Sequence, residues 1–410
     1  MLFCLSDKFC FVGILKDQND LFFSRNLMET EPVFGYIKDM NNSFAQDFHK
    51  ILSKEFPQFL KKYLNIPILS RLKGVGLLCG TDWTPFFKNN FFYSRFDHSV
   101  GVALIIWHFT KDKAQAIAGL LHDVSTPAFS HVSDFRKGDA LTQTATEDDN
   151  GSMLACSKEL LECLAQDELT LEQVNDYHKY PIADNEVPQL SADRLEYMFP
   201  SGAALSGTWS LKQSFSLDEI EKIYNDLVIC KNEDGIEELG FKTLSVAELY
   251  FNRVMDIAFF LQKNEDKMAM QFPATILNMA VKLEILKESD FFEMSEEEII
   301  SRLDELVKSN PDATVEDALA EKDSVKKLCV YFRTYRSFKS ITRSKEPLPG
   351  HYCVNLQVKK RYINPLVVTG EQTEGLFKAK RITELSETAK KSKEKFLAYV
   401  DESFGCAELV

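Results

Sequence analysis

Hydrophobic and polar positions recur with a helical period over most of the chain. The clearest segments are residues 98–109 and 113–123, which are rich in Ala, Leu and Ile and contain few polar side chains. A helix that is apolar nearly all round is a buried helix. We therefore predict two buried core helices here, with His98 in the first and the adjacent pair His122 and Asp123 at the end of the second.

Further helices are predicted from the residues that begin them. A Ser or Thr followed three positions later by Glu or Gln has the spacing of a capping box, in which each side chain satisfies a backbone N–H that the helix leaves unpaired. The stretch 247–287 is also periodic, and we expect it to be helical with one break at Pro273. The capping-box spacing predicts helices that start near residues 171, 217 and 296, after Thr170–Gln173, Ser216–Glu219 and Ser295–Glu298.

The pattern changes after about residue 345. Residues 351–368 alternate and are rich in β-branched side chains, which predicts one or two strands, and the last thirty residues return to a charged helix. Residues 231–240 are acidic with two glycines, which indicates a loop or a short hairpin. The predicted fold class is mainly α. It comprises a poorly ordered N-terminal extension at 1–30, a helical core at 31–290 and a smaller mixed α+β region at 291–410.

Composition narrows the class of protein. The chain has 410 residues, of which 45% are hydrophobic, and this allows a sizeable core. Its net charge of -14 argues against a broad nucleic-acid-binding face. The nine cysteines are dispersed without a CxxC pair, which argues against a disulfide framework and a cysteine zinc site. No segment has the roughly 20 apolar residues of a membrane span, and we see no signal peptide. We expect a reduced, cytoplasmic, enzyme-sized protein.

The few histidines are placed where chemistry is expected. Burying an ionised carboxylate beside imidazoles within apolar helices is costly unless a cation compensates. A divalent metal does so, and His with carboxylate ligands suits Fe, Mn, Ni or Zn. The alternative is that His122 and Asp123 are only a helix C-terminal cation and a local cap. The pair alone favours that alternative, but the motifs around it favour the metal.

Four ordered blocks resemble the HD-domain metal-dependent phosphohydrolases. They are SRFDHSVG around His98, AGLLHD ending at Asp123, PAFSHVSD around His131, and DRLEY from Asp193 to Tyr197. The resemblance is strongest to the branch that includes the bacterial dGTP triphosphohydrolases and the vertebrate SAM-and-HD-domain dNTP triphosphohydrolase. It implies an HD-domain helical core, a nucleotide or related small phosphate ester as substrate, and a homo-oligomer.

The resemblance also implies roles for individual residues. The metal ligands would be His98, His122, Asp123 and Asp193, and Arg95 and Tyr197 would contact a substrate phosphate. His131 and Asp134 match the block in which a histidine lies beside the phosphate site. A metal held in this way lowers the pKa of bound water, polarises the phosphoryl oxygen and orients the attack.

Three departures from the family pattern leave the reaction open. Thr126 and Thr146 stand where the triphosphohydrolases carry histidines, and Pro200–Ser201 replaces an Arg–Asp pair. Glu147, His131 or His178 could take over proton transfer, although His178 is equally well read as a surface imidazole. We favour a metal-dependent phosphohydrolase because all four metal ligands that the resemblance implies are present in this sequence. The alternative is a nucleotide-binding regulatory protein with little or no turnover.

Basic residues cluster at 331–345, in YFRTYRSFKSITRSK. Their spacing of three or four predicts one basic helix face. The simpler interpretation is a solvated face that offsets acidic neighbours. The more specific interpretation is that these residues form a surface that binds phosphate or a nucleotide effector. Lys359, Lys360 and Arg361 would belong to the same surface.

Overall fold

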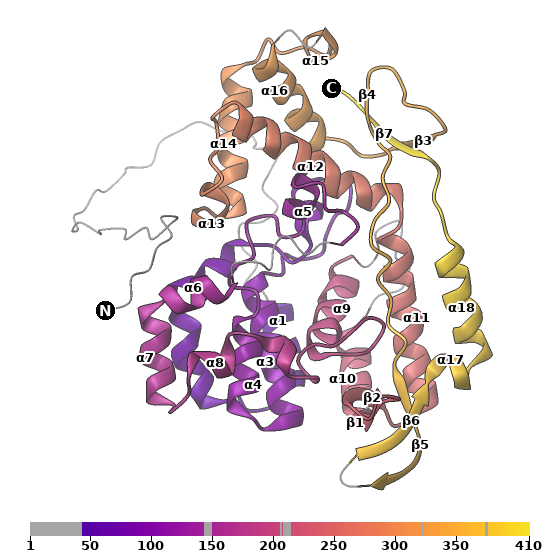
Figure 1. Cartoon of the computed structure of the whole chain (residues 1–410). Helices are drawn as coiled ribbons and strands as arrows, with labels where there is room; N and C mark the ends of the chain where they lie inside the picture. Colours follow the sequence, from indigo (N-terminus) through magenta and orange to yellow (C-terminus); the bar gives the residue numbers. More distant parts are fainter. Residues whose placement is uncertain (1–42, 143–149, 206, 208–214, 321–322, 374–375) are drawn as a thin grey trace. The chain divides into compact units, whose positions relative to one another are not determined.

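The computed structural model describes residues 43–142, 150–205, 207, 215–320, 323–373 and 376–410. The predicted extension at 1–30 lies outside these residues, as do Thr146 and Glu147. Helices dominate and the strands form two small sheets, so the predicted class, mainly α with a smaller α+β region, is confirmed (Figure 1).

The elements have the following bounds. The α-helices are α1 Ser43–Leu52, α2 Pro67–Ser70, α3 Arg95–Thr110, α4 Lys113–Leu121, α5 Val132–Arg136, α6 Asn150–Cys156, α7 Lys158–Gln166, α8 Leu171–Val174, α9 Ala192–Ala204, α10 Leu217–Asn225, α11 Leu244–Phe260, α12 Asn264–Lys282, α13 Asp290–Glu293, α14 Glu296–Ser309, α15 Val315–Ala320, α16 Ser324–Tyr335, α17 Ile382–Leu385 and α18 Glu387–Ala398. Short 3-10 helices are η1 Gln58–Asn65, η2 Arg71–Gly74, η3 Cys79–Trp83 and η4 Tyr177–Lys179. The strands are β1 Leu227–Lys231, β2 Glu237–Phe241, β3 Thr342–Ser344, β4 His351–Val354, β5 Leu366–Thr373, β6 Leu376–Arg381 and β7 Phe404–Glu408.

The two predicted core helices are α3 and α4, and both are almost entirely buried. Helix α3 begins with a capping box between Ser94 and Asp97, and the Asp112 side chain accepts two backbone N–H bonds at the start of α4. Helix α3 packs against α4 and α9. These three helices carry all four predicted metal ligands at or beside their ends.

The structure confirms the three predicted capping boxes, which begin α8, α10 and α14. The predicted break at Pro273 is wrong, because the chain breaks at residues 261–263 and Pro273 lies inside α12. Proline has no N–H for the carbonyl four residues earlier. That carbonyl belongs to Ala269 and packs against Gly80 instead. A Cβ atom at position 80 would lie 1.9 Å from the Ala269 oxygen.

Of the loop or short hairpin predicted at 231–240, the structure has the hairpin, formed by β1 and β2. The one or two strands predicted in 351–368 are β4 and the beginning of β5, which continues to Thr373. Strands β1, β2, β5 and β6 close on one another in a mixed sheet, and β3, β7 and β4 form another sheet that is antiparallel throughout. The charged helix expected in the last thirty residues is α18, but β7 follows it and was not predicted. Its partners, β3 and β4, lie more than fifty residues earlier, so no local pattern reveals the pairing.

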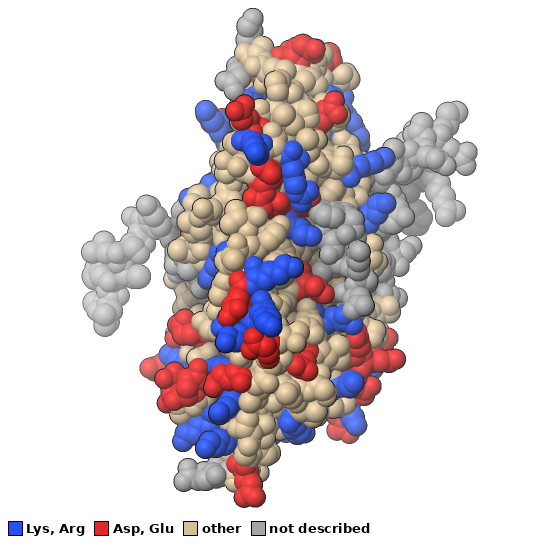
Figure 2. Space-filling model, turned by 90° about the vertical axis from the view of Figure 1, so that its right-hand side faces the viewer, with Lys and Arg blue, Asp and Glu red and all other residues tan. Residues whose placement is uncertain are grey.

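Two expectations about side chains are wrong. The basic cluster is not one helix face, because α16 ends at Tyr335 and Arg343 lies on β3, where it pairs with Glu265 at 2.6 Å and Asp401 at 3.1 Å. The expectation of a reduced chain is also wrong for one pair of cysteines. Cys353 and Cys406 form a disulfide, because β4 and β7 place them directly opposite each other. The ion pairs of Arg343 with acidic neighbours fit the simpler interpretation of the basic cluster. Figure 2 shows lysines and arginines interspersed with acidic residues over the face that it draws.

The proposed division at residue 290 stays a prediction. Within the described residues, the larger of two buried hydrophobic clusters extends from Ala45 to Ala407 and so includes side chains on both sides of residue 290. None of the described helices has the length and apolar character needed to cross a bilayer.

Candidate metal centre and its pocket

The four predicted metal ligands converge on one point. His98 lies in the first turn of α3, His122 and Asp123 follow the last residue of α4, and Asp193 lies in the first turn of α9. One atom from each of His98, His122 and Asp123 lies within 4.8 Å of the others. Asp193 Oδ1 is 3.1 Å from His98 Nε2 and 3.7 Å from His122 Nε2. Three helix ends therefore present two imidazoles and two carboxylates to the same space.

These separations fit a shared cation. Asp123 Oδ2 lies 3.7 Å from His98 Nε2 and 3.5 Å from His122 Nε2. Donors about 2.1 Å from a metal are about 3.0 to 3.4 Å from each other, so only small shifts are needed. Imidazole with carboxylate suits Mn, Fe, Ni or Zn. His122 does occupy the C-cap position of the simpler alternative, but its Nε2 faces carboxylates from two segments of the chain.

Hydrogen bonds fix which nitrogen each histidine offers. The Nδ1 of His98 contacts the carboxylate of Glu196, which is fully buried on α9 and also accepts the Tyr93 hydroxyl at 2.6 Å. The Nδ1 of His122 lies 2.7 Å from the carbonyl of Gly119. A metal-bound histidine almost always donates its other N–H to a carboxylate or carbonyl. Both rings therefore direct Nε2 toward Asp123 and Asp193.

Opposite charges stabilise the cluster. Burial alone would lower the pKa of His98, but the Glu196 and Asp193 carboxylates outweigh it and raise the pKa to about 10. Burial would raise the pKa of Asp123, but Arg95 and the two histidines hold it well below its usual range. The pKa of Asp193 is likewise lowered, because His98 outweighs the effect of burial. The carboxylates thus stay ionised in a buried setting, as metal ligands must.

Arg95 links the metal centre to a strained loop. Its Nη1 donates to Asp123 Oδ2 at 2.9 Å and its Nε donates to Ser130 Oγ at 3.0 Å. Phe129 and Ser130 have φ values of 64° and 49°, a left-handed conformation that costs a non-glycine residue about 1 to 2 kcal/mol. Such strain persists only where the surroundings enforce it.

Glu296, the first residue of α14, enforces that loop conformation. Its fully buried carboxylate accepts N–H bonds from Phe129 at 2.8 Å, Gly76 at 2.9 Å and the Trp83 indole at 2.6 Å. Burial raises the pKa of Glu296 to about 7. Glu296 therefore anchors the loop that leads into His131.

A pocket lined by His122, Asp123 and Asp193 lies beside the candidate ligands, and His131 and Asp134 occupy different positions relative to it. His131 lines it, and His131 Nδ1 lies 2.9 Å from Asp134 Oδ2. Asp134 is fully buried and does not line the pocket, so its carboxylate can orient His131 but does not reach a substrate. Burial lowers the pKa of His131, with the Asp134 hydrogen bond opposing.

His178 lies on η4 and lines the same pocket as His122, Asp123 and Asp193. The ring centroid of its neighbour Tyr177 is 4.4 Å from that of His178 and 4.8 Å from that of His122. His178 contacts Asp176 at 3.1 Å and Asp184 at 3.5 Å. Its side chain is about half exposed, so it can exchange protons with solvent.

The pocket itself has a volume of about 660 Å³. Tyr197 lines it one turn after Asp193 on α9, and burial raises the pKa of this tyrosine, with the positive charge of Arg361 opposing. Thr126 lines it too and donates to Asp123 Oδ1 at 2.9 Å.

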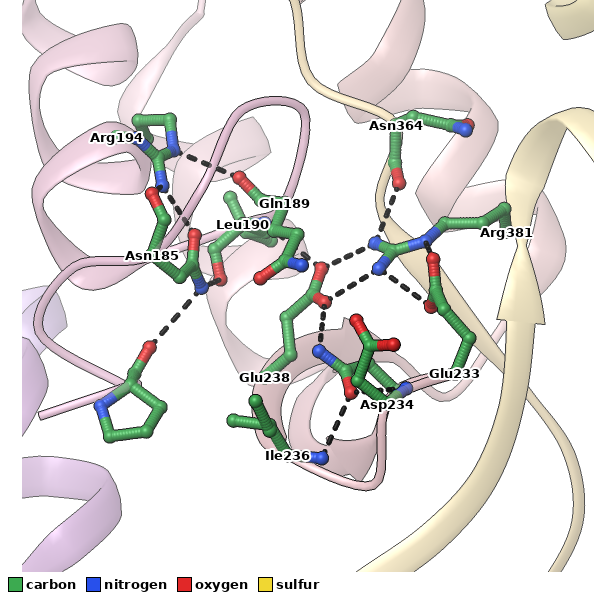
Figure 3. A network of polar contacts seen from close by, with 12 residues as sticks. Asn185, Gln189, Leu190, Arg194, Glu233, Asp234, Ile236, Glu238, Asn364 and Arg381 are labelled. Atoms are coloured by element: carbon green, nitrogen blue, oxygen red, sulfur yellow. Dashed lines mark hydrogen bonds and ion pairs between the residues drawn. The ribbon is translucent and has the colours of Figure 1, made fainter.

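A polar network stabilises the part of the pocket wall formed by residues 185–189 and the β1–β2 turn (Figure 3). Arg381, at the end of β6, pairs with Glu238 on β2 at 2.6 Å and with Glu233 in the turn at 2.8 Å. Glu238 also accepts the backbone N–H of Leu190 at 3.0 Å. The network thereby ties the loop before α9 to two strands of the closed sheet.

Several of these residues were not predicted from the sequence as part of the site. Glu196 follows Asp193 by three positions on one helix, a spacing that places both on the same face and could have indicated its role. Glu296 carries no comparable signal, because its partners lie 167 and more residues earlier. Lys359 and Arg361 were considered only as part of a separate surface, yet both line this pocket.

Comparisons with known proteins show which proteins this chain is similar to. No family model matches the chain. It is similar to the uncharacterized protein YdhJ of Bacillus subtilis (strain 168), with 24% identity over 254 residues, which are 58% of this chain and 69% of YdhJ. Its structure resembles that of a phosphohydrolase from Bacteroides thetaiotaomicron, with 15% identity, a TM-score of 0.57 and coverage of 87% of this chain and 97% of that one. It also resembles a hypothetical protein from Aquifex aeolicus, with 14% identity, a TM-score of 0.54 and coverage of 86% and 92%. The chain therefore shares its fold with these two proteins.

Proposed function

We propose that this chain is a metal-dependent phosphohydrolase of the HD type that acts on a nucleotide or a related phosphate ester. The observation that carries the proposal is the convergence of His98, His122, Asp123 and Asp193, with both Nε2 atoms facing both carboxylates. The fold shared with the Bacteroides phosphohydrolase supports it. Membership of the dNTP triphosphohydrolase branch, and assembly into a homo-oligomer, belong to the same proposal.

The surrounding side chains suit the binding of a phosphate ester. A divalent ion held by the four ligands would polarise a phosphoryl oxygen and activate water. Arg95, beside Asp123, can grip phosphate oxygens through its planar guanidinium, and the Tyr197 hydroxyl supplies another donor. A volume of about 660 Å³ lies within the usual range for small-molecule sites and accommodates a nucleotide.

His178 is the proposed proton donor to the leaving group, since it lines the same pocket as His122 and its side chain is about half exposed to solvent. General acid catalysis contributes about 10² to 10⁴-fold. We therefore expect His178→Gln to lower kcat at least about 100-fold and to abolish the alkaline limb of its pH profile. His351→Gln, outside the pocket, is the matched control and should behave as wild type. An unchanged kcat and pH profile in His178→Gln would assign proton transfer elsewhere.

A substrate screen tests the proposed function itself. Nucleoside mono-, di- and triphosphates are incubated with the chain and Mn, Fe, Co, Ni or Mg, and the released phosphate, pyrophosphate or triphosphate is identified. We expect hydrolysis of at least one combination, with the product naming the leaving group. Thr126 offers a hydroxyl to Asp123 where the family's enzymes carry an imidazole, and this favours the alternative of a regulatory protein. Nucleotides that raise the melting temperature without any hydrolysis would establish that alternative.

A further inference from the structure

Helix α13 and the first residue of α14 hold the loop before α5 in place. The backbone N–H of Ala128 donates to the Phe291 carbonyl at 2.8 Å, and the N–H of the next residue, Phe129, donates to the Glu296 carboxylate at 2.8 Å. The guanidinium carbon of Arg136, on α5, lies 3.9 Å from the centroid of the Phe291 ring. Neither Phe291 nor Glu296 lines the candidate active-site pocket. These two residues therefore act on the pocket through the residues that they hold.

Glu296 also binds the segment that precedes η3. Its Oε1 accepts the N–H of Gly76 at 2.9 Å as well as that of Phe129. A Cβ atom at position 76 would lie 2.7 Å from the Asp82 carboxylate, so the close approach requires glycine. Gly76 in turn forms an isolated bridge with Ser94, the N-cap residue of α3. One carboxylate oxygen thus joins the loop before α5 to the residues beside the start of α3.

Ser130 connects these bonds to Arg95. The Ser130 hydroxyl donates to the Gly76 carbonyl at 2.8 Å and accepts the Nε–H of Arg95 at 3.0 Å. Because Nη1 donates to Asp123 at 2.9 Å, the guanidinium is held at two points. Ser130 has a left-handed backbone, with a φ of 49°, and such a conformation persists only where the surroundings enforce it. The contacts that start at Glu296 thus end at the guanidinium.

The orientation of Arg95 matters because its guanidinium is the proposed phosphate contact. The side chain lines the pocket, although only 7% of Arg95 is exposed. A guanidinium binds two phosphate oxygens at once only when its planar fork faces them. A side chain that hydrogen bonds already hold also loses little conformational entropy when an anion binds. Residues that fix Arg95 should therefore control the affinity of the pocket for phosphate.

We propose that Glu296 is a positioning residue for Arg95, which it holds through the turn at Phe129 and Ser130. The affinity of the pocket for phosphate then depends on a carboxylate that touches neither substrate nor metal. This inference rests on the proposed function, in which Arg95 contacts a substrate phosphate. It extends the support of the site to α14, a helix that contributes no lining residue to the pocket.

Glu296→Gln removes this hold while it keeps the shape of the side chain. The two carboxylate oxygens accept three N–H groups, those of Gly76, Phe129 and the Trp83 indole. An amide has only one acceptor oxygen, so its NH2 group must face at least one of these donors. A buried N–H without an acceptor is unfavourable, and we expect the turn to shift.

A double-mutant cycle with inorganic phosphate as the probe tests the proposal. The full chain is titrated calorimetrically, with the same manganese concentration in cell and syringe. We expect Arg95→Gln and Glu296→Gln each to weaken phosphate binding about tenfold, which corresponds to about 1.4 kcal/mol. The double variant should also lose only about tenfold, because Glu296 acts through Arg95. A general structural role of Glu296 gives losses that add instead, to about 100-fold in the double variant.

Two further variants complete the test. Ser130→Ala removes the link between the turn and the guanidinium but leaves the bonds of Glu296 intact, so it decides the question even if Glu296→Gln does not fold. It should weaken phosphate binding and add nothing in the Arg95→Gln background. Glu298→Gln is the matched control, because Glu298 is another carboxylate in the first turn of α14 and should be dispensable for phosphate binding. Melting curves check that each variant is folded.

Three results would overturn the positioning role: wild type that does not bind phosphate, wild-type affinity in Ser130→Ala or in folded Glu296→Gln, or losses that add in the double variant. Failure of the proposed function appears separately. In that case the nucleotide screen shows no hydrolysis, while phosphate binding still depends on Arg95 and Glu296.

Discussion

Replacing Asp193 with alanine will strip the purified chain of its divalent metal and lower phosphate release more than about 100-fold. Asp193 Oδ1 is within 3.1 Å of His98 Nε2 and 3.7 Å of His122 Nε2, so the substitution removes the donor that faces both imidazoles. Loss of residues that merely orient ligands costs about 10- to 100-fold, and loss of a ligand should exceed that. His122→Ala should have the same effect.

Metal content by plasma mass spectrometry and phosphate release on the same samples provide the measurement. Asp234→Ala is the matched control, because Asp234 is a carboxylate that lines the same pocket and is not one of the four proposed ligands. Asp234→Ala also removes one negative charge from the pocket, but it should retain metal. The comparison therefore distinguishes the loss of a ligand from the loss of charge alone. Full metal content and full activity in Asp193→Ala would refute the ligand assignment.

Replacing Glu196 with glutamine will weaken metal binding about tenfold while the chain stays folded. The buried Glu196 carboxylate contacts His98 Nδ1 and accepts the Tyr93 hydroxyl. An amide keeps the shape and one acceptor but loses the charge that makes the ring a stronger ligand. Glu196→Ala also removes the acceptor, so its loss of metal affinity should approach 100-fold.

Competition with a coloured chelator measures these affinities. Glu238→Gln supplies the control, because Glu238 is equally buried and hydrogen-bonded but belongs to the Arg381 network. It should lower the melting temperature and leave metal affinity unchanged. Metal affinity equal to wild type in Glu196→Gln would show that the carboxylate does not tune His98.

The sequence predicted those parts of the site that local patterns encode. Runs rich in Ala, Leu and Ile with few polar residues identified α3 and α4, and the ordered blocks placed His98, His122, Asp123 and Asp193 together, as the structure has them. Capping boxes identified the starts of three helices because each depends only on side chains three positions apart.

Features set by tertiary contacts were beyond such patterns. The helix continues through Pro273 because the Ala269 carbonyl packs against Gly80, a residue distant in sequence. The disulfide between Cys353 and Cys406 depends on the register of β4 against β7. Arg361 enters the pocket only because its backbone segment is held by Gln262 and Pro188. In each case the decisive partner comes from another part of the chain.

The central claim is that the His98, His122, Asp123 and Asp193 cluster holds a divalent ion on which phosphate-ester hydrolysis depends. The most direct test measures metal content and nucleotide hydrolysis on one wild-type preparation, before and after removal of metal by a chelator and after its return. The account predicts a single tightly bound divalent ion per chain, and hydrolysis that disappears and recovers with it. A chain that binds no divalent ion, or hydrolysis that is unchanged when the ion is removed, would contradict it.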